Sequence, residues 1–356
     1  MDMRPIVDAD GHLDERPDEI IACLDPPLRD QAIIGRGHGL FPSWQATENR
    51  ARTYLHGQTH SPYRHDPTPE RWLEFADRAG IEQAILYPTD ALSFSLCEDP
   101  EVAVLLARAY NTWAHDRYTR FSERLKCVAL LPLQDVPSAV RELRRIHSEL
   151  GMPGAFLPAI GPRKPLGSQD YWPIYEEAER LGCFLGVHGA HMGRGRDILS
   201  GLRGAGLLHH PISQLVELTS FVSEGVFETF PRLKVGFLEA GCGWVPYLMD
   251  RLDEKWEVNH ARSPLRKKPS SYVRECRLYF SAEPYESTLP LMIERVGADH
   301  LFVASDFPHE LDDAGFLQHL DEWRGQTALG EDTLQQILTE TAREAYGLPR
   351  LAAAGA

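Results

Sequence analysis

The residues best suited to chemistry lie near the start of the chain, where a short apolar run ends in Asp10-Gly11-His12. Residues two apart in a β-strand point to the same face, so a strand ending here presents the Asp10 carboxylate and the His12 imidazole to one point. Both groups are common ligands of divalent metal ions. The alternative is a buried strand followed by an ordinary Asp-Gly turn, and this segment alone does not decide between them.

Four later apolar runs also end in acids or histidines. Their terminal residues are His188, with His191 just beyond it, then Glu239, Glu283, and Asp306, with His309 behind it. Each of these residues also has a structural interpretation that needs no shared site. A histidine can be buried in the core, and an acid can cap a helix or form one half of an ion pair. Their joint recurrence at the ends of apolar runs favours a shared site.

A metal site is the chemistry that this set of residues predicts. Two imidazoles and two carboxylates suit one divalent ion, with Zn²⁺ favoured and Mn²⁺ as the alternative. The four predicted ligands are Asp10, His12, His188 and Asp306. One position stays open for water or a substrate oxygen. Such an ion lowers the pKa of bound water to about 7 and polarises a carbonyl or carboxylate.

Glu239 is the candidate for catalytic proton transfer. The strand that precedes it is mostly apolar, and desolvation at a buried strand end is expected to raise the pKa of a carboxyl. A carboxyl group with a raised pKa can act as a general acid or base near neutral pH.

Strand-like and helix-like segments alternate along the chain and position these residues. The expected strands cover 5–10, 83–88, 125–133, 154–159, 183–189, 234–240, 278–282 and 300–305. The expected helices cover 68–80, 99–113, 135–150, 171–181, 215–230, 244–258, 289–296 and 333–345. Eight strands, each followed by a helix, predict an α/β protein with a (β/α)₈ TIM barrel, in which the carboxyl ends of the strands meet at one mouth. An open, doubly wound sheet is the alternative, but no Gly-rich phosphate loop follows the first strand.

One catalytic domain is expected to span residues 1–356, because this length suits a single barrel with insertions. Residues 13–70 form a long irregular insertion after the first strand, rich in Gly, Pro, His and Arg. Such an insertion is typical of a lid or binding loop, and a surface excursion is the alternative. Residues 193–215 are also predicted to be mainly loop, and His209-His210-Pro211 within them is open to a functional or a structural interpretation.

The insertion supplies candidates for substrate binding. Arg50 and Arg52 are candidates for holding a substrate carboxylate, because a guanidinium offers two parallel donors. Trp44 is a candidate for packing against an aromatic ring. The alternative for all three is an ordinary role on a surface loop. Together with His191 and Glu283, they make up the predicted substrate-binding set.

The composition narrows the range of partners. The net charge of −15 at pH 7 opposes binding to nucleic acid phosphates and anionic membranes. No segment approaches about 20 consecutive apolar residues and no signal-peptide core follows the first residues, so a cytoplasmic protein with a small-molecule substrate is expected. The six cysteines are scattered without a CxxC pair, which indicates neither a disulfide framework nor a thiolate zinc site.

Four segments carry a family resemblance. They are Asp8-Ala9-Asp10-Gly11-His12-Leu13-Asp14-Glu15, Val187-His188, Leu238-Glu239-Ala240-Gly241 and Ala304-Ser305-Asp306-Phe307-Pro308-His309. The first is similar to a DxDxHxxE signature, and together they resemble the amidohydrolase-2 branch of the amidohydrolase superfamily. That branch includes aminocarboxymuconate semialdehyde decarboxylase and γ-resorcylate decarboxylase. The resemblance spans essentially the whole chain and implies a dimeric, metal-dependent (β/α)₈ barrel with the four residues named above as ligands.

The chain also departs from these relatives. The better-known decarboxylases of the branch have His or Glu at the position of Asp10, and a histidine that helps to handle the proton at the position of Glu239. Glutamate can also do acid–base work, so the difference concerns the reaction more than the fold. No lysine ends the fourth strand, where Leu157-Pro158 stand. A carbamylated-lysine centre with two metals is therefore not expected, which favours one metal.

The combined prediction is a metal-dependent, non-oxidative decarboxylase of an aromatic or conjugated unsaturated carboxylic acid. The ion would bind the substrate carboxylate, and Glu239 or metal-bound water would handle the proton. One alternative is a hydrolase that directs metal-activated water at an amide, lactone or C–C ketone bond. A second alternative is a non-catalytic barrel that binds a ligand, and stoichiometric metal content distinguishes it from the enzymes.

Overall fold

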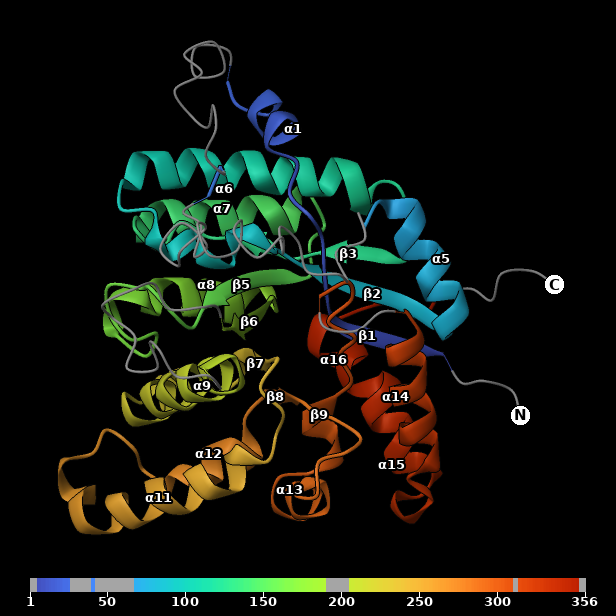
Figure 1. Cartoon of the computed structure of the whole chain (residues 1–356). Helices are drawn as coiled ribbons and strands as arrows, with labels where there is room; N and C mark the ends of the chain where they lie inside the picture. Colours follow the sequence, from blue (N-terminus) through green and yellow to red (C-terminus); the bar gives the residue numbers. More distant parts are fainter. Residues whose placement is uncertain (1–4, 26–39, 42–66, 190–204, 310–312, 352–356) are drawn as a thin grey trace.

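Parallel strands form the centre of the molecule. The computed structural model describes residues 5–25, 40–41, 67–189, 205–309 and 313–351 (Figure 1). The strands are β1 (Ile6–His12), β2 (Ile81–Tyr87), β3 (Leu125–Cys127), β4 (Ala129–Leu130), β5 (Gly154–Pro158), β6 (Phe184–His188), β7 (Lys234–Leu238), β8 (Leu278–Ser281) and β9 (Leu301–Phe302). All paired neighbours are parallel, in the orders β1-β2-β3 and β4 to β9.

Backbone hydrogen bonds join these two sheets into a closed barrel. Only Val128 separates β3 from β4, and its N–H donates to the Leu86 carbonyl of β2 at 3.1 Å, so β3 and β4 act as one strand. On the other side, the Ala9 N–H of β1 donates to the Val303 carbonyl after β9, also at 3.1 Å. Counting β3 and β4 together gives eight strands among the described residues, which confirms the predicted (β/α)₈ barrel.

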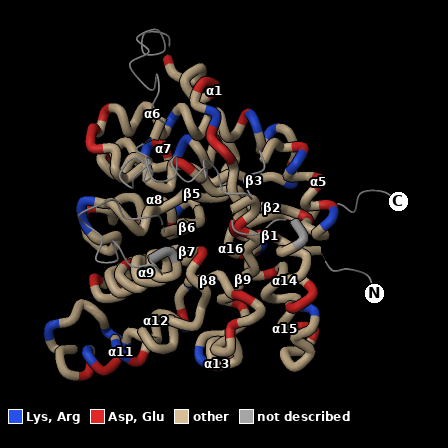
Figure 2. The backbone as a smooth tube through the Cα atoms, in the orientation of Figure 1, with Lys and Arg blue, Asp and Glu red and all other residues tan. Residues whose placement is uncertain are grey.

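Helices surround the strands on the outside, and many of the charged residues lie on them (Figures 1 and 2). The main ones are α5 (Pro69–Ala79), α6 (Pro100–Ala114), α7 (Val136–Ser148), α8 (Trp172–Leu181), α9 (Ala205–Ser223), α11 (Trp244–Asn259), α13 (Leu289–Arg295), α14 (Asp313–Gly325) and α16 (Thr341–Tyr346). Shorter helices are α1 (Pro17–Ala22), α10 (Val226–Thr229), α12 (Pro269–Glu275) and α15 (Glu331–Gln335). The carboxylates of Asp99 and Asp135 accept N–H bonds at the starts of α6 and α7 and so cap these helices.

The clearest difference from the predicted elements lies in α9. Residues 193–215 were expected to be mainly loop, but α9 begins at Ala205 and contains Pro211 in its interior. The helix tolerates this proline because packing of its apolar residues, such as Leu218 and Phe221, against the core outweighs one lost backbone hydrogen bond. The helix expected over 215–230 is interrupted at Gly225, whose φ of 79° separates α9 from α10.

The insertion after β1 is described only in part. Residues 17–22 form α1, so this part of the insertion is regular. Leu40 and Phe41 are buried, and the Phe41 ring packs edge-to-face on Phe94 and Tyr110. Residues 26–39 and 42–66 lie outside the described residues, so the lid stays a prediction. Besides α1, two helices among the described residues were not predicted, α12 and α14, although Phe316, Leu320 and Trp323 of α14 follow helical spacing and are buried.

The six cysteines, which all lie within the described residues, form no disulfide with one another, as predicted. Within the described residues, every helix is too short or too polar to cross a lipid bilayer.

Helix α9 is held to the barrel by two buried polar side chains. The Gln214 amide donates to the carbonyls of Val187 and Leu238, at 3.2 and 2.5 Å, which lie at the ends of β6 and β7. The Glu217 carboxylate accepts the Leu166 N–H at 2.7 Å. This anchoring fixes the first half of α9 beside the mouth of the barrel.

Glu217 gives a prediction about stability and pH. Burial raises the pKa of Glu217 from 4.5 to about 7, so the folded state favours the protonated carboxyl and loses stability as the pH rises from 4.5 towards 7. Glu217→Gln keeps an acceptor for the Leu166 N–H but does not ionise. We expect the variant to gain about 2 kcal/mol over the wild type between pH 5 and 8. Urea unfolding at several pH values measures this difference, and a constant offset would contradict it.

Candidate metal centre

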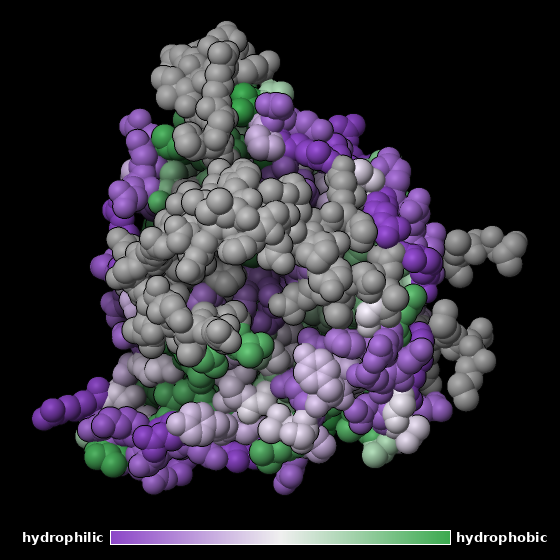
Figure 3. Space-filling view, viewed as in Figure 1, coloured by the Kyte–Doolittle hydropathy of each residue, from purple (hydrophilic) through white to green (hydrophobic). Residues whose placement is uncertain are grey.

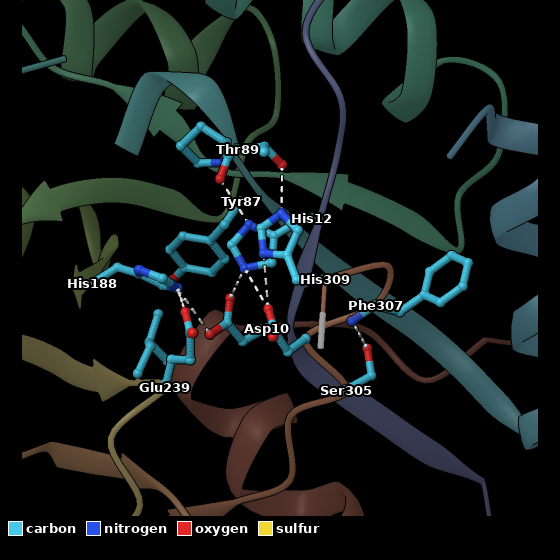
Figure 4. A network of polar contacts seen from close by, with 12 residues as sticks. Asp10, His12, Tyr87, Thr89, His188, Glu239, Ser305, Phe307 and His309 are labelled. Atoms are coloured by element: carbon cyan, nitrogen blue, oxygen red, sulfur yellow. Dashed lines mark hydrogen bonds and ion pairs between the residues drawn. The ribbon is translucent and has the colours of Figure 1, made fainter. Parts of the chain in front are cut away.

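The four predicted ligands lie together at the carboxyl ends of the strands, and Figure 4 labels Asp10, His12 and His188 among them. His12 Nε2 lies 3.7 Å from Asp10 Oδ1 and 3.2 Å from Asp306 Oδ1, while His188 Nε2 lies 3.5 Å from Asp10 Oδ2. Asp10 therefore stands between the two histidines. The side chains of Asp10, His12 and His188 are fully or almost fully buried, and that of Asp306 is 15% exposed. Figure 3 shows hydrophilic residues in the hollow at the centre of the viewed face.

Both histidines present the nitrogen that a metal ion requires. His12 Nδ1 lies 2.7 Å from the Pro88 carbonyl, and His188 Nδ1 lies 2.7 Å from the Gly189 carbonyl. A carbonyl oxygen can only accept a hydrogen bond, so each Nδ1 carries a hydrogen. Each neutral ring then has a lone pair on Nε2, and this second hydrogen bond fixes the orientation of the ring.

The buried atoms around this point lack partners. Among the described residues, both carboxylate oxygens of Asp10 and Asp306 and the Nε2 atoms of His12 and His188 have no hydrogen-bond partner. Burying a polar or charged atom is costly unless it is paired or binds a metal. These four side chains therefore fit a divalent cation.

Repulsion between carboxylates is visible at Asp10. Burial, followed by repulsion from Glu239, Asp306 and Asp8, raises the pKa of Asp10 well above its usual value. Burial also raises the pKa of Asp306, but attraction to His309 and His12 outweighs it and the net pKa is lowered. A divalent cation would compensate the negative charge of this cluster.

Glu239 lies beside the four residues and contacts His210, for which the sequence left a functional and a structural interpretation open. Its Oε2 lies 2.9 Å from His188 Nε2, and its Oε1 lies 3.5 Å from His210 Nε2. Burial raises the pKa of Glu239, but attraction to His210 and His188 outweighs it, so the net pKa is lowered. The expected rise in the pKa of Glu239 is therefore wrong, because the neighbouring imidazoles favour the carboxylate.

His210 reaches this position from α9. It precedes Gln214, the anchor of α9, by four residues, which places both on one face of the helix. A Cβ atom at Gly189 would lie 2.5 Å from His210 Nδ1, so glycine at this position makes room for the ring. The spacing of His210 and Gln214 was the available sequence signal, but it has meaning only if residues 205–215 are helical.

His309 supports Asp306 and His12. Its ring stacks on that of His12, with centroids 3.9 Å apart, and its Nδ1 lies 3.1 Å from Asp306 Oδ1. The Thr89 hydroxyl donates to the Leu13 carbonyl at 2.6 Å, so it accepts from His309 Nε2 at 2.9 Å. His309 is thus fixed through both ring nitrogens.

Glu15, the last acid of the opening signature, holds the loop after β2. Its carboxylate accepts the N–H groups of Thr89, Asp90 and Ala91 at 2.9–3.2 Å. Burial, followed by repulsion from Asp90, raises the pKa of Glu15 to about 8. Because Pro88 precedes this loop and binds His12, Glu15 contributes to the orientation of that histidine.

Asp8, the first acid of the signature, connects β1 to the segment after β9. It accepts the N–H groups of Asp10 and Ser305 at 3.3 and 3.0 Å and the Ser305 hydroxyl at 2.5 Å. The Ser305 hydroxyl oxygen in turn accepts the Phe307 N–H at 3.1 Å. Asp8 therefore fixes the position of the backbone on both sides of Asp306, directly at Ser305 and through the Ser305 hydroxyl at Phe307.

Replacing Asp8 should separate its acceptor role from its charge. Asp8→Ala leaves three buried donors without an acceptor, so we expect a loss of about 3 kcal/mol of unfolding free energy and a 10- to 100-fold weaker metal affinity. Asp8→Asn keeps one oxygen acceptor. Burial raises the pKa of Asp8 to about 6, so the carboxyl ionises at neutral pH at a cost that the amide avoids, and the Asn variant should lose clearly less stability and metal affinity than the Ala variant. Equal losses in both variants, by urea unfolding and metal titration, would contradict this assignment.

Two of the site carboxylates lie on an unusual backbone. Glu239 and Asp306 have φ values of 54° and 49°, in the left-handed region that only glycine adopts without cost. Such strain is typical of residues that a functional site requires.

This backbone gives a prediction about stability. Glu239→Gly relieves the strain and Glu239→Ala does not, so the Gly variant should be more stable by about 1 kcal/mol. Chemical denaturation of the metal-free proteins measures the difference. An Ala variant as stable as the Gly variant would show that residue 239 is not strained.

Of the remaining predicted site residues, the structure describes Glu283 alone. Glu283 Oε2 lies 3.7 Å from His319 Nδ1 on α14, which gives Glu283 a partner outside the four predicted ligands. Trp44, Arg50, Arg52 and His191 lie outside the described residues.

Comparisons with known proteins agree with this architecture. The family model for amidohydrolases matches residues 7–348. γ-Resorcylate decarboxylase of Rhizobium radiobacter is 27% identical over 292 residues, which cover 78% of this chain and 86% of the relative. The 2-amino-3-carboxymuconate-6-semialdehyde decarboxylase of Dictyostelium discoideum is 25% identical over 287 residues, covering 79% and 77%. A dihydroxybenzoic acid decarboxylase from Polaromonas sp. JS666, solved with bound manganese and the inhibitor 2-nitroresorcinol, aligns over 98% of both chains with a TM-score of 0.72 and 20% identity, which shows a shared fold.

Proposed function

Since this chain belongs to the amidohydrolase family, we propose that it is a metal-dependent, non-oxidative decarboxylase of an aromatic or conjugated unsaturated carboxylic acid. The observation that carries the proposal is the set of buried ligand atoms without partners on Asp10, His12, His188 and Asp306. The names of the relatives, which are decarboxylases of such acids, support the choice of reaction.

One divalent ion, Zn²⁺ or Mn²⁺, is proposed to be held by these four residues. When bound, it would neutralise the substrate carboxylate and stabilise negative charge on a neighbouring oxygen. The manganese in the Polaromonas enzyme supports a divalent ion, but the donor set of two imidazoles and two carboxylates suits either metal.

The Glu239–His210 pair is proposed to handle the proton. In a non-oxidative decarboxylation, a proton adds to the carbon that carries the carboxylate, and the electrons of the C–C bond return to the substrate as CO₂ leaves. The side chains of Glu239 and His210 are 18% and 17% exposed, so they reach the open side of the cluster, as Asp306 does at 15%. His210 Nε2 faces Glu239 Oε1, which allows a proton to be held between them.

The other predicted partners remain proposals. The substrate is proposed to be a small carboxylate, and the roles of Arg50, Arg52, Trp44, His191 and Glu283 in binding it stay predictions. The expected homodimer and cytoplasmic location also stay predictions.

The test is an assay of the Mn²⁺- or Zn²⁺-loaded protein with γ-resorcylate and a panel of aromatic and conjugated acids. We expect CO₂ and the decarboxylated product in equal amounts, loss of activity on chelation and recovery when metal is restored. Lactone, ester or amide cleavage without CO₂ from any acid would replace the proposal with the hydrolase. A protein without stoichiometric metal, and with unchanged stability after chelation, would favour the non-catalytic barrel.

A further inference from the structure

We propose that Glu239 is a fifth protein ligand of the metal ion and binds it through Oε2. The inference rests on the proposed function only in requiring a divalent ion among Asp10, His12, His188 and Asp306. It concerns the position where this chain has an acid in place of the histidine expected from the resemblance.

The first argument is that Glu239 faces His188 as Asp306 faces His12. The carboxylate oxygen lies 2.9 Å from the Nε2 atom in the first pair and 3.2 Å in the second. Neither Nε2 atom has a hydrogen-bond partner among the described residues, so the structure records both as close contacts between a nitrogen and an oxygen.

Such a separation is the one expected for two ligands of a common ion. Ligand atoms that each lie about 2.1 Å from an ion are about 3 Å apart when they subtend a right angle. In both pairs the second ring nitrogen, Nδ1, already donates to a backbone carbonyl. Each Nε2 atom, which lies near a carboxylate oxygen, therefore keeps its lone pair for an ion.

The second argument comes from the backbone. Glu239 follows β7 and Asp306 follows β9, and both adopt the left-handed conformation, with φ of 54° and 49°. They are the only non-glycine residues with positive φ among those that the structure describes. Strain of this kind persists where the surrounding structure requires a particular side-chain position. The same backbone conformation turns both carboxylates towards a predicted metal-binding histidine.

The third argument is the environment of the other Glu239 oxygen. Oε1 lies 3.5 Å from His210 Nε2, while Oε2 is the oxygen nearer His188. A ligating carboxylate is commonly oriented by a partner on its second oxygen. His210 is that partner for Oε1. Metal binding by Oε2 therefore leaves the Glu239–His210 contact available for proton transfer.

The resulting ligand set has three carboxylates and two imidazoles. It is richer in oxygen than the predicted four-residue set, which suits harder ions such as Mn²⁺. Five protein ligands also leave one position fewer for the substrate than four ligands do.

The direct test is a crystal structure of the Mn²⁺-loaded wild-type protein, with the ion identified by anomalous scattering. We expect Glu239 Oε2 at about 2.2 Å from the ion. A bound ion with both Glu239 oxygens beyond bonding distance would overturn the inference.

A titration of Mn²⁺ affinity gives a second, independent readout. Glu239→Gln should weaken Mn²⁺ binding at least about tenfold, while Glu217→Gln, which removes a buried carboxylate from α9 outside the ligand set, should leave it within about twofold. Equal affinities in the Glu239→Gln variant and the wild type would also overturn the inference.

The outcomes separate this inference from the proposed function. Mn²⁺ bound without Glu239, in a protein that releases CO₂ from aromatic acids, would remove the fifth ligand and keep the decarboxylase. Glu239 bound to the ion in a protein that only hydrolyses lactones would keep the fifth ligand and overturn the decarboxylase. A wild-type protein that binds neither Mn²⁺ nor Zn²⁺ would overturn both.

Discussion

Asp10→Asn is expected to abolish activity and, in the same molecule, to stabilise the metal-free protein. Asp10 stands between His12 and His188, so replacing its carboxylate removes a central ligand of the proposed ion. We expect kcat/KM to fall by at least about 10³-fold, together with the metal content. In the metal-free protein, however, this carboxylate is buried and repelled by Glu239 and Asp306, and its pKa is raised well above the usual value.

The sign of the stability effect follows from that raised pKa. The folded state binds a proton at Asp10 more tightly than the unfolded state, so ionisation lowers the stability of the metal-free protein as the pH rises above the unfolded value of 3.8. An amide of the same shape does not ionise. We therefore expect metal-free Asp10→Asn to exceed the metal-free wild type by about 1–2 kcal/mol at pH 7, and by less at pH 5.

Unfolding in urea with and without a chelator measures these effects. With saturating metal the order should reverse, because binding to the folded state stabilises only the wild type. Glu217→Gln serves as a control for the loss of a buried acid, since it should retain metal content and activity. A less stable metal-free Asp10→Asn would show that the carboxylate makes a favourable contact, and the account of mutual repulsion at the site would be wrong.

The part of the site on the strands could be predicted from the sequence. Asp10, His12, His188, Glu239 and Asp306 each end an apolar run, and parallel strands of a barrel bring such ends to one mouth. The alternation of strands and helices was therefore enough to place them together. It was not enough to give the pKa of Glu239, because that value depends on the imidazole of His210.

The part of the site on helices and loops could not be predicted in the same way. His210 lies in a segment with glycines and Pro211, where local sequence favours a loop and only packing against the barrel stabilises a helix. His309 was noticed beside Asp306, but its stacking on His12 depends on a contact between the two ends of the chain. Glu283 ends a strand as the others do, yet its carboxylate faces His319 of α14, a helix that was not predicted.

His210→Gln is expected to lower kcat by about 10²- to 10³-fold without loss of the metal. The residue lies outside the predicted ligand set, and its Nε2 faces Glu239 Oε1 on the partly exposed side of the cluster. Glutamine fills similar space and can donate a hydrogen bond to Glu239, but it cannot deliver and regain a proton. KM should therefore change less than kcat, and the metal content of the purified variant should equal that of the wild type.

Hydrogen exchange in the reaction product distinguishes proton transfer from a structural role of His210. An enzyme that protonates a substrate carbon should also catalyse exchange of that C–H hydrogen with D₂O in the product, since this is the reverse of the same step. We expect exchange in the wild type and its loss in His210→Gln. The same substitution at His260, an exposed residue after α11, should leave exchange and kcat unchanged. If His210→Gln keeps the exchange while kcat falls, the proton comes from another group, and Glu239 would be the one to test next.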